Sequence, residues 1–223
     1  MTIDPADRQT AVDWLRNELV VDEARIELLD RFVALLLDEA KRQNLIAKAT
    51  IPAVWSRHVQ DSAQLLSHVP RETSLDWIDL GSGAGLPGIV NAIIAADSNF
   101  TLVERRPLRT EWLERAAAAL DLTNVQVMTA PVSAVPDRTF DVITARAFAP
   151  MPKLFNMAQR FATGKTLWIL PKGRSANDEL KAIPGWQDTF HVEPSITDDE
   201  SGIVIGRIDP ARLPARARNG VRR

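Results

Sequence analysis

An acidic residue and a row of glycines stand together at the end of a short apolar segment. The acid is Asp79, and the glycines, spaced one residue apart, are Gly81, Gly83 and Gly85. Glycines allow a sharp turn and leave backbone N–H groups uncovered, and Pro87 suits the first turn of a following helix. A strand that ends at such a turn and leads into a helix presents free donors and a partial positive charge to a ligand. The stretch therefore predicts a nucleotide site.

The class of nucleotide depends on how the glycines are placed relative to the acid. Gly83, Gly85 and Gly88 match the G-x-G-x-x-G spacing of dinucleotide-binding folds. Gly81, however, follows the strand directly, which puts Asp79 within the last strand residues. A carboxylate there repels a pyrophosphate but accepts hydrogen bonds from an ammonium group. The pattern favours S-adenosylmethionine, which carries an amino acid, a sulfonium and no phosphate; a dinucleotide is the alternative.

A second acid ends the next expected strand. Residues 100–103 form an apolar run that ends at Glu104, roughly 20 residues beyond the turn, where an acid can bind the ribose hydroxyls of a nucleotide. Both classes of nucleotide need this acid. The alternative for Glu104 is an ion pair with Arg105 or Arg106.

Two cations occupy positions where α/β proteins bind their ligands. Arg146 follows an expected strand over 140–144, and Lys172 follows another over 165–170. Ligands of open α/β sheets bind beyond the carboxyl ends of the strands. Both side chains are therefore candidate site residues, and a salt bridge at the edge of the sheet is the alternative for Arg146.

A polar cluster is predicted on the helix that leads into the glycine-rich strand. His58, Asp61 and Ser62 are three and four residues apart, so they share one helix face. Such a cluster could line the mouth of the site. The structural alternative is that it braces the junction between the helix and the sheet.

The order of the expected elements indicates the fold class. A pair of helices is predicted over 7–40 and another helix over 51–68, after which strands and helices alternate up to an antiparallel hairpin around the acidic turn 198–200. This order predicts an α/β protein with a Rossmann-like seven-stranded sheet of the class I methyltransferase type, its last strand antiparallel. We expect a helical extension over 1–70, a methyltransferase domain over 71–210 and a flexible basic tail over 211–223.

The composition excludes several kinds of chemistry. The chain of 223 residues has no cysteine, which excludes disulfides and thiol nucleophiles, and its 3 histidines are too scattered for a zinc site, so we expect no metal. Without a leader-like or membrane-length apolar run, the chain is expected to be cytoplasmic. The tail carries several arginines and no acid, which suits contact with RNA phosphates or a solvated terminus.

Six short segments, taken together, carry a more specific pattern. They are N-L-I at 44–46, R-H-V-Q-D-S at 57–62, D-L-G-S-G-A-G-L-P-G at 79–88, T-L-V-E at 101–104, A-R-A-F-A at 145–149 and P-K-G at 171–173. In this order they resemble the glucose-inhibited division protein B family, the small-subunit rRNA guanine-N7 methyltransferases. The R-H-x-x-D-S segment combined with the glycine-rich one is far more specific than either alone.

The resemblance implies S-adenosylmethionine as the cofactor and Glu104 as the ribose acid. By position, the family's other cofactor contacts fall on Gly81, Leu86, Val132, Ser133 and Arg146. Family members often carry an acid where Ser133 stands, so the backbone amide of Ser133 is the expected contact there.

The resemblance also implies a reaction, methylation of N7 of guanine 527 in the decoding-region loop of 16S rRNA, free or within the small ribosomal subunit or its precursor. N7 of neutral guanine has a free lone pair and loses no proton, so no general base is expected. Arg146 and Lys172 are candidates for donating to O6 of guanine. Asp61 could accept from N1–H and N2, with His58 orienting it. We expect a monomer that does not contact membranes.

Two other functions fit the same residues. One is an S-adenosylmethionine-dependent methyltransferase of another RNA, a protein or a small molecule, which the glycine turn and Glu104 do not exclude, although the segment 57–62 and the arginine-rich tail favour rRNA. The other is a non-catalytic nucleotide-binding module that acts as a scaffold on RNA. Binding of S-adenosylmethionine compared with NAD, and methyl transfer to rRNA, would separate these functions.

Overall fold

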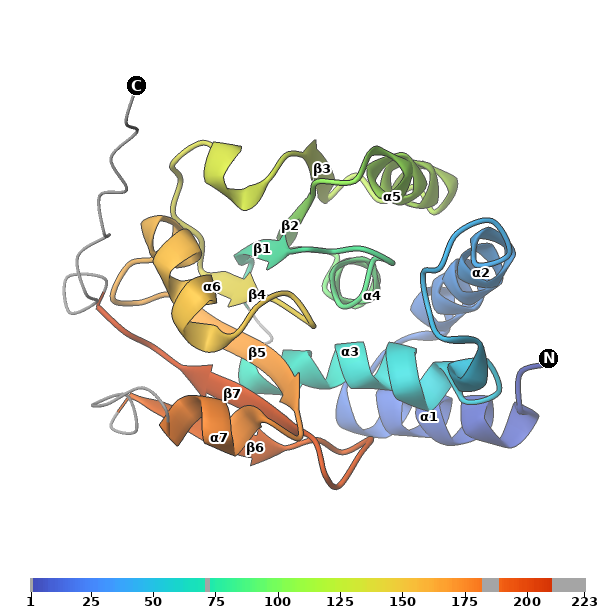
Figure 1. The fold of residues 1–223 in the computed structure, drawn as a ribbon. Coiled ribbons are helices and arrows are strands. Elements are labelled where there is room, and N and C mark those ends of the chain that lie inside the picture. Colours follow the sequence, from blue (N-terminus) through green and yellow to red (C-terminus); the bar gives the residue numbers. More distant parts are fainter. Residues whose placement is uncertain (1, 71–72, 182–188, 210–223) are drawn as a thin grey trace.

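A seven-stranded sheet runs through the molecule in the order β3-β2-β1-β4-β5-β7-β6 (Figure 1). The computed structural model describes residues 2–70, 73–181 and 189–209, so the predicted basic tail over 211–223 lies outside the described residues. The strands are β1 (Asp76–Leu80), β2 (Asn99–Glu104), β3 (Val125–Thr129), β4 (Val142–Thr144), β5 (Leu167–Gly173), β6 (Phe190–Pro194) and β7 (Gly202–Gly206).

The central strands are parallel and the chain reverses its direction of winding between β1 and β4. Asp79 of β1 lies opposite Leu102 of β2 on one side and Thr144 of β4 on the other. β7 is antiparallel to both β5 and β6. The seven-stranded sheet and its antiparallel strand were predicted and are confirmed. The point between β1 and β4 is where open α/β sheets bind ligands.

Helices cover both faces of the sheet because the strand residues alternate between two apolar clusters. Trp77 of β1 belongs to the cluster shared with α1, α2, α4 and α5, whereas Ile78 and Leu80 belong to the cluster shared with α6 and α7. The helices on the two faces are α1 (Pro5–Glu18), α2 (Glu23–Glu39), α4 (Gly88–Ile94), α5 (Pro107–Ala119), α6 (Met151–Ala158) and α7 (Ala176–Lys181). Short 3-10 segments are η1 (Lys48–Thr50), η4 (Val132–Ala134) and η5 (Gln159–Phe161).

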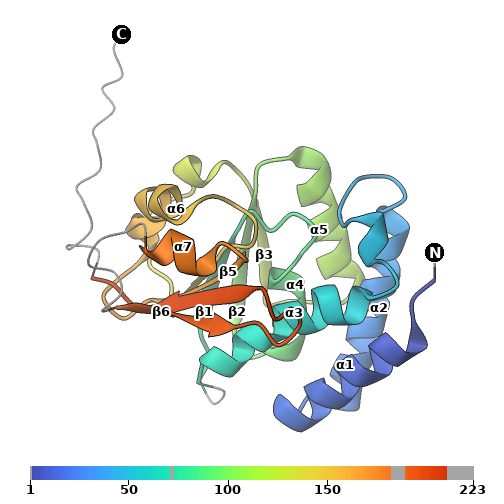
Figure 2. The same cartoon turned by 60° about the horizontal axis from the view of Figure 1, so that its bottom comes forward.

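The N-terminal helices pack on the sheet through the same core as α4 and α5. Figure 2 shows α1 and α2 at one end of the molecule, with the helix of α3 running from them toward the β6–β7 hairpin. Asp22 caps α2 by accepting from the backbone N–H of Arg25 at 2.9 Å, as an N-cap residue does. The predicted boundary between an extension and a methyltransferase domain at residue 70 stays a prediction.

The helix predicted over 51–68 begins later and winds unevenly. It consists of a π-helical turn η2 (Trp55–Gln60), then α3 (Asp61–Ala63) and the 3-10 turn η3 (Gln64–His68). Wide π turns shift the angular spacing of side chains and are frequent at functional sites. The helix therefore does not keep the regular spacing on which the sequence prediction relied.

Smaller differences concern strand ends and the last helix. β5 continues through the Pro-Lys-Gly segment to Gly173 because it pairs there with β7, although the sequence predicted that the strand ends at residue 170. β4 is shorter than predicted and begins at Val142. Over the described residues, no helix combines the length and the apolar character needed to span a membrane.

Asp7 of α1 holds the start of this uneven helix. Its carboxylate accepts from the backbone N–H groups of Trp55 at 2.9 Å and Ser56 at 3.3 Å. We predict that Asp7→Ala lowers the free energy of unfolding by about 1 kcal/mol because those two N–H groups lose their acceptor. Asp7→Asn keeps an oxygen acceptor and is the matched control, measured by urea unfolding alongside it. Equal stability of the alanine variant and the wild type would contradict this assignment.

Candidate functional site

The glycine turn after β1 is bonded to the neighbouring strand. The backbone N–H groups of Gly81 and Ser82 both donate to the carbonyl of Val103, at 2.8 and 3.2 Å. Gly81 has φ of +79°, a left-handed conformation that favours glycine. A Cβ added to Gly88 would lie 2.3 Å from Leu102 Cδ2, so the start of α4 packs against β2 without room for a side chain. The turn is thus held against the ends of two parallel strands.

A cavity of about 370 Å³ lies beside this turn. Four of the predicted cofactor residues line it, namely Gly81, Glu104, Val132 and Ser133. They come from the turn, the end of β2 and η4, which are far apart in sequence. The structure therefore brings these four residues together at one edge of the sheet, and their contact with the cofactor stays a prediction.

Glu104 is held in place by backbone donors. Its Oε1 accepts from the N–H groups of Arg105 at 2.8 Å and Arg106 at 2.9 Å. Its Oε2 lies 3.9 Å from Nη1 of Arg109, which also lines the cavity. The sequence allowed an ion pair between Glu104 and the side chain of Arg105 or Arg106. In the structure these two residues instead donate to Glu104 through their backbone N–H groups. One carboxylate oxygen is thereby fixed, while the other remains for a ligand.

Asp79 lies behind the turn rather than in the cavity. Only 1% of its surface is exposed, and Oδ1 accepts from the hydroxyl of Thr144 at 3.0 Å. Burial raises the pKa of Asp79 to about 6, against the opposing effect of hydrogen bonds from Ser82, Thr144 and the Gly88 amide. The expected direct contact with a cofactor ammonium is therefore corrected: Asp79 braces the strand end and the start of α4 from within.

Of the other predicted residues in the turn, Gly83 lies near the cavity, whereas Gly85 and Leu86 pack against α4. Gly83 stays near the cavity, because a Cβ there would lie 3.3 Å from Nη1 of Arg109. Leu86 is buried against the apolar cluster of α4. A Cβ on Gly85 would meet Ile89 at 2.7 Å, so Gly85 lies against the helix. Gly85 and Leu86 therefore shape the turn, and neither residue lines the cavity beside Glu104.

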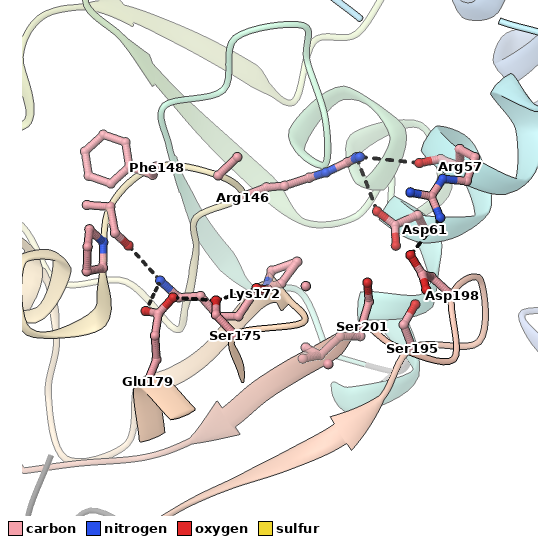
Figure 3. Close-up of a pocket in the computed structure, with 17 residues that line it drawn as sticks. Arg57, Asp61, Arg146, Phe148, Lys172, Ser175, Glu179, Ser195, Asp198 and Ser201 are labelled. Atoms are coloured by element: carbon pink, nitrogen blue, oxygen red, sulfur yellow. Dashed lines mark hydrogen bonds and ion pairs between the residues drawn. The ribbon is translucent and has the colours of Figure 1, made fainter. Parts of the chain in front are cut away.

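A second cavity, of about 570 Å³, opens on the other side of the loop 145–150 (Figure 3). The loop joins β4 to α6, and Ala147, Phe148 and Ala149 line both cavities. Arg146, Asp61 and Lys172, three residues predicted from the sequence, line the second cavity. Arg146 lines this cavity and not the one beside Glu104, so its predicted cofactor contact gains no support from this geometry.

The guanidinium of Arg146 is fixed by the uneven helix. Nη2 donates to the carbonyl of Arg57 and to Nδ1 of His58, each at 3.3 Å, and Nη1 lies 3.4 Å from Oδ2 of Asp61. Figure 3 shows the side chain reaching from the loop to Arg57 and Asp61. The alternative of a salt bridge is thus correct for Arg146, but the bridge lies inside a ligand-sized cavity.

The contacts of His58 determine its tautomer. A guanidinium can only donate, so Nδ1 accepts from Arg146 and the proton is on Nε2, which donates to the Thr50 hydroxyl at 2.8 Å. Thr50 in turn donates to the carbonyl of Ala47 at 2.7 Å. Burial, followed by the charges of Arg146 and Arg57, lowers the pKa of His58 to about 4, so the ring is neutral at pH 7. His58 therefore orients Arg146 and not Asp61, which corrects the sequence prediction.

The acceptor oxygens of Asp61 are already used within the protein. Oδ1 accepts from Gln64 Nε2 at 2.9 Å and from the Thr197 hydroxyl at 3.0 Å, while Oδ2 faces Arg146. Asp61 thus ties the helix to the β6–β7 hairpin and to Arg146. Ser62 is buried and donates to the carbonyl of His58 at 2.6 Å, so it does not share the cavity face with Asp61.

Lys172 is also engaged by the protein. Its ammonium donates to the carbonyl of Ala149 at 2.7 Å and pairs with Glu179 Oε2 at 3.0 Å, and only 8% of its side chain is exposed. Glu179 also accepts from the backbone N–H of Met151 at 2.8 Å. The pair therefore fastens the end of the loop 145–150, and the expected donation from Lys172 to a guanine is not what this geometry favours.

Sequence reasoning missed several residues that line the two cavities. Arg109, Lys153 and Met157 line the cavity beside Glu104, whereas Arg57 and Glu179 line the other. Arg57 pairs with Asp198 at 2.9 Å, which connects the helix to the hairpin turn. The position of Arg109 one turn into the helix after Glu104 was a usable signal. The pairing of residues 57 and 198 had no local signal.

Comparison with known proteins identifies the family. The family model described as rRNA small subunit methyltransferase G matches residues 25–193. The chain belongs to this family. It is similar to a ribosomal RNA small subunit methyltransferase G of Novosphingobium aromaticivorans, with 52% identity, 91% of this chain and 89% of the relative covered. A protein of the same name from Sphingopyxis alaskensis is 46% identical, with 92% and 89% covered.

Solved structures confirm the fold class independently. A ribosomal protein L11 methylase from Lactobacillus delbrueckii has a TM-score of 0.55 and 15% identity, with 68% of this chain and 78% of the other covered. A mutant of MtNAS in complex with S-adenosylmethionine also has a TM-score of 0.55, at 16% identity, with 89% and 83% covered. At this identity the likeness concerns the fold alone. Together with the family assignment, the predictions of a class I methyltransferase fold and of S-adenosylmethionine as cofactor are confirmed.

The buried carboxyl of Asp79 makes stability depend on pH. Its folded pKa of about 6 exceeds the ordinary 3.8, so its contribution is fully present below pH 3.8 and is lost as pH rises through 6. We predict that the wild type loses about 2 kcal/mol more unfolding free energy than Asp79→Asn between pH 4.5 and 7.5. Urea unfolding at both pH values measures this difference, and parallel pH dependence of the two proteins would contradict it. His58 is present in both proteins and cancels.

The Lys172–Glu179 pair can be tested as a loop anchor. We predict that Lys172→Met and Glu179→Gln each lower the free energy of unfolding by about 1–3 kcal/mol, and that the double variant loses less than the sum. Both single variants should also lose methyltransferase activity, because the loop 145–150 is released. If Lys172→Met alone lost activity while keeping full stability, Lys172 would be a substrate contact instead.

Proposed function

We propose that this protein transfers the methyl group of S-adenosylmethionine to N7 of guanine 527 in 16S rRNA, within the small ribosomal subunit or its precursor. The observation that carries the proposal is the meeting of two cavities at the loop 145–150. One lies beside the glycine turn and Glu104, and the other beside Arg146. A methyl donor in the first and a purine in the second would face each other across the loop.

The residues of the smaller cavity suit the cofactor. Glu104 offers Oε2 to ribose hydroxyls, Val132 and Ser133 offer an apolar side chain and a backbone amide to adenine, and Gly81 leaves bare backbone for the amino-acid part. A volume of about 370 Å³ lies within the usual range of about 300–1,000 Å³ for ligand sites. When bound, the cofactor supplies a methyl group on a positively charged sulfur.

The chemistry asks the protein mainly to position the reactants. The lone pair of N7 forms the new bond to the methyl carbon while the bond from that carbon to sulfur breaks, and no proton is removed. Correct placement of two reactants can supply about 7–11 kcal/mol of barrier reduction. We therefore assign no general base, and the neutral His58 is engaged with Arg146 and Thr50 in agreement with this.

Arg146 is the residue that we assign to guanine recognition. Guanidinium groups are the usual donors to O6 of guanine. Arg146 has five N–H donors, and its three contacts within the protein do not use all of them. Donation to N7 itself would block the lone pair, so the contact belongs at O6 or a phosphate. Asp61 and His58 then act as positioning residues for Arg146.

The experiment maps N7-methylguanine in 16S rRNA from cells that lack the protein and cells that carry it. We expect N7-methylguanine at position 527 only in cells that carry the protein. The proposal would fail if the modified base lay elsewhere in 16S rRNA or in another RNA. With purified subunits, Arg146→Ala should lower kcat/KM about 10- to 100-fold because an O6 contact is lost. Its affinity for S-adenosylmethionine, measured by calorimetry, should stay within threefold.

Two control variants sharpen this test. Arg16→Ala removes an exposed arginine of α1 that lines neither cavity, so it should leave both quantities unchanged. Glu104→Gln should weaken cofactor binding because a charged acceptor for ribose hydroxyls is lost. Loss of cofactor affinity in Arg146→Ala would instead place Arg146 in the cofactor site.

A further inference from the structure

Phe148 occupies the junction through which a methyl group would pass. Among the described residues the two cavities share Ala147, Phe148 and Ala149, and of these only Phe148 has a side chain larger than a methyl group. Its ring rests on the bare backbone of the glycine turn, because a Cβ added to Gly81 would lie 2.6 Å from Phe148 Cδ2. The ring therefore borders the cofactor turn and both cavities at once.

The surroundings hold the ring at this place. Ala147 has φ of +49°, an uncommon conformation for a residue with a Cβ, which persists where neighbouring contacts impose it. Arg146 before it is bound by the uneven helix, and the carbonyl of Ala149 after it is bound by Lys172. In Figure 3 the Arg146 side chain and the Phe148 ring point to opposite sides of the loop. Arg146 and Phe148 thus line the second cavity from different sides of the loop.

We propose that Phe148 is the stacking platform of the guanine, so that its ring holds the base plane with N7 turned toward the sulfonium; this rests on the proposed function. Proteins hold unstacked bases on aromatic faces, and an aromatic ring at the boundary between the cavities supplies such a face. Arg146 would then bind the edge of the base while Phe148 binds its plane.

The ring also suits the charge that develops during the reaction. N7 donates its lone pair to the methyl carbon, the electron pair of the carbon–sulfur bond stays on sulfur, and the positive charge passes from sulfur to the guanine ring. An aromatic face attracts a cation, so stacking strengthens as the base becomes charged. A leucine of similar bulk fills the space but has no such face. The proposal therefore separates an aromatic platform from an apolar wall.

The test compares Phe148→Trp, Phe148→Leu and Phe148→Ala on small subunits that lack the mark. The wild-type protein must first produce N7-methylguanine. If it does not, the proposed function fails, whatever the Phe148 variants do. Given that activity, the tryptophan variant should remain within threefold of wild type. The leucine and alanine variants should lose about 10- to 100-fold in kcat/KM, the range expected for loss of one stacked base.

Two further measurements exclude other roles of the ring. Calorimetry with S-adenosylmethionine should give the same affinity within threefold for all variants, and a parallel loss of cofactor binding would make Phe148 a cofactor wall and overturn the proposal. Full activity of Phe148→Leu would also overturn it. Should the leucine variant not fold, ring-fluorinated phenylalanine at position 148 keeps the shape and weakens the negative face. The single-turnover rate should then fall with each fluorine, and an unchanged rate would contradict the proposal.

Discussion

The loop between β4 and α6 is fixed at both ends by charged side chains, and its residues line both cavities. At its start, Arg146 is bound to the carbonyl of Arg57, to His58 and to Asp61. At its end, Lys172 holds the carbonyl of Ala149 and pairs with Glu179. A loop with a left-handed alanine in its middle would otherwise relax toward a commoner backbone conformation. Released from these anchors, it would no longer separate the space beside Glu104 from the space beside Arg146.

This arrangement requires one titratable ring to stay uncharged. A protonated His58 would put a second positive charge against the guanidinium of Arg146 and would lose the acceptor at Nδ1. Burial prevents this, since it lowers the pKa of His58 to about 4. Asp79 shows the opposite effect on the other side of the strand ends, where burial raises its pKa to about 6. Both shifts favour the neutral form, as desolvation does, and both residues support the site from behind rather than contacting the cavities directly.

The parts of the site that the sequence predicted well are those determined by local pattern. Glu104 and Arg146 follow apolar strands, and parallel strands bring their carboxyl ends to one edge, so their placement follows from the order of the elements. Lys172 was expected by the same rule but lies within the last residues of β5, and its partner Glu179 lies on a later helix, so no local signal indicated the pair. Ser62 does not join Asp61 at the cavity, because its hydroxyl turns back to the carbonyl of His58 within the helix. Phe148 belongs to the A-R-A-F-A segment at 145–149, yet only its packing against Gly81 reveals the position of its ring.

For the proposed methylation of guanine N7, the site uses almost only residues that also hold the fold together. Because the proposed nucleophile brings its own lone pair, no side chain must be kept free to exchange a proton, and polar side chains near the second cavity can be engaged in internal hydrogen bonds. Asp61 illustrates this, since Gln64 and Thr197 share one of its oxygens and Arg146 faces the other. Saturation limits the motion of the side chains, and restricted motion is what a reaction that depends on alignment requires. In the proposed reaction, the ion pairs around the loop would thus contribute by fixing geometry rather than by moving protons.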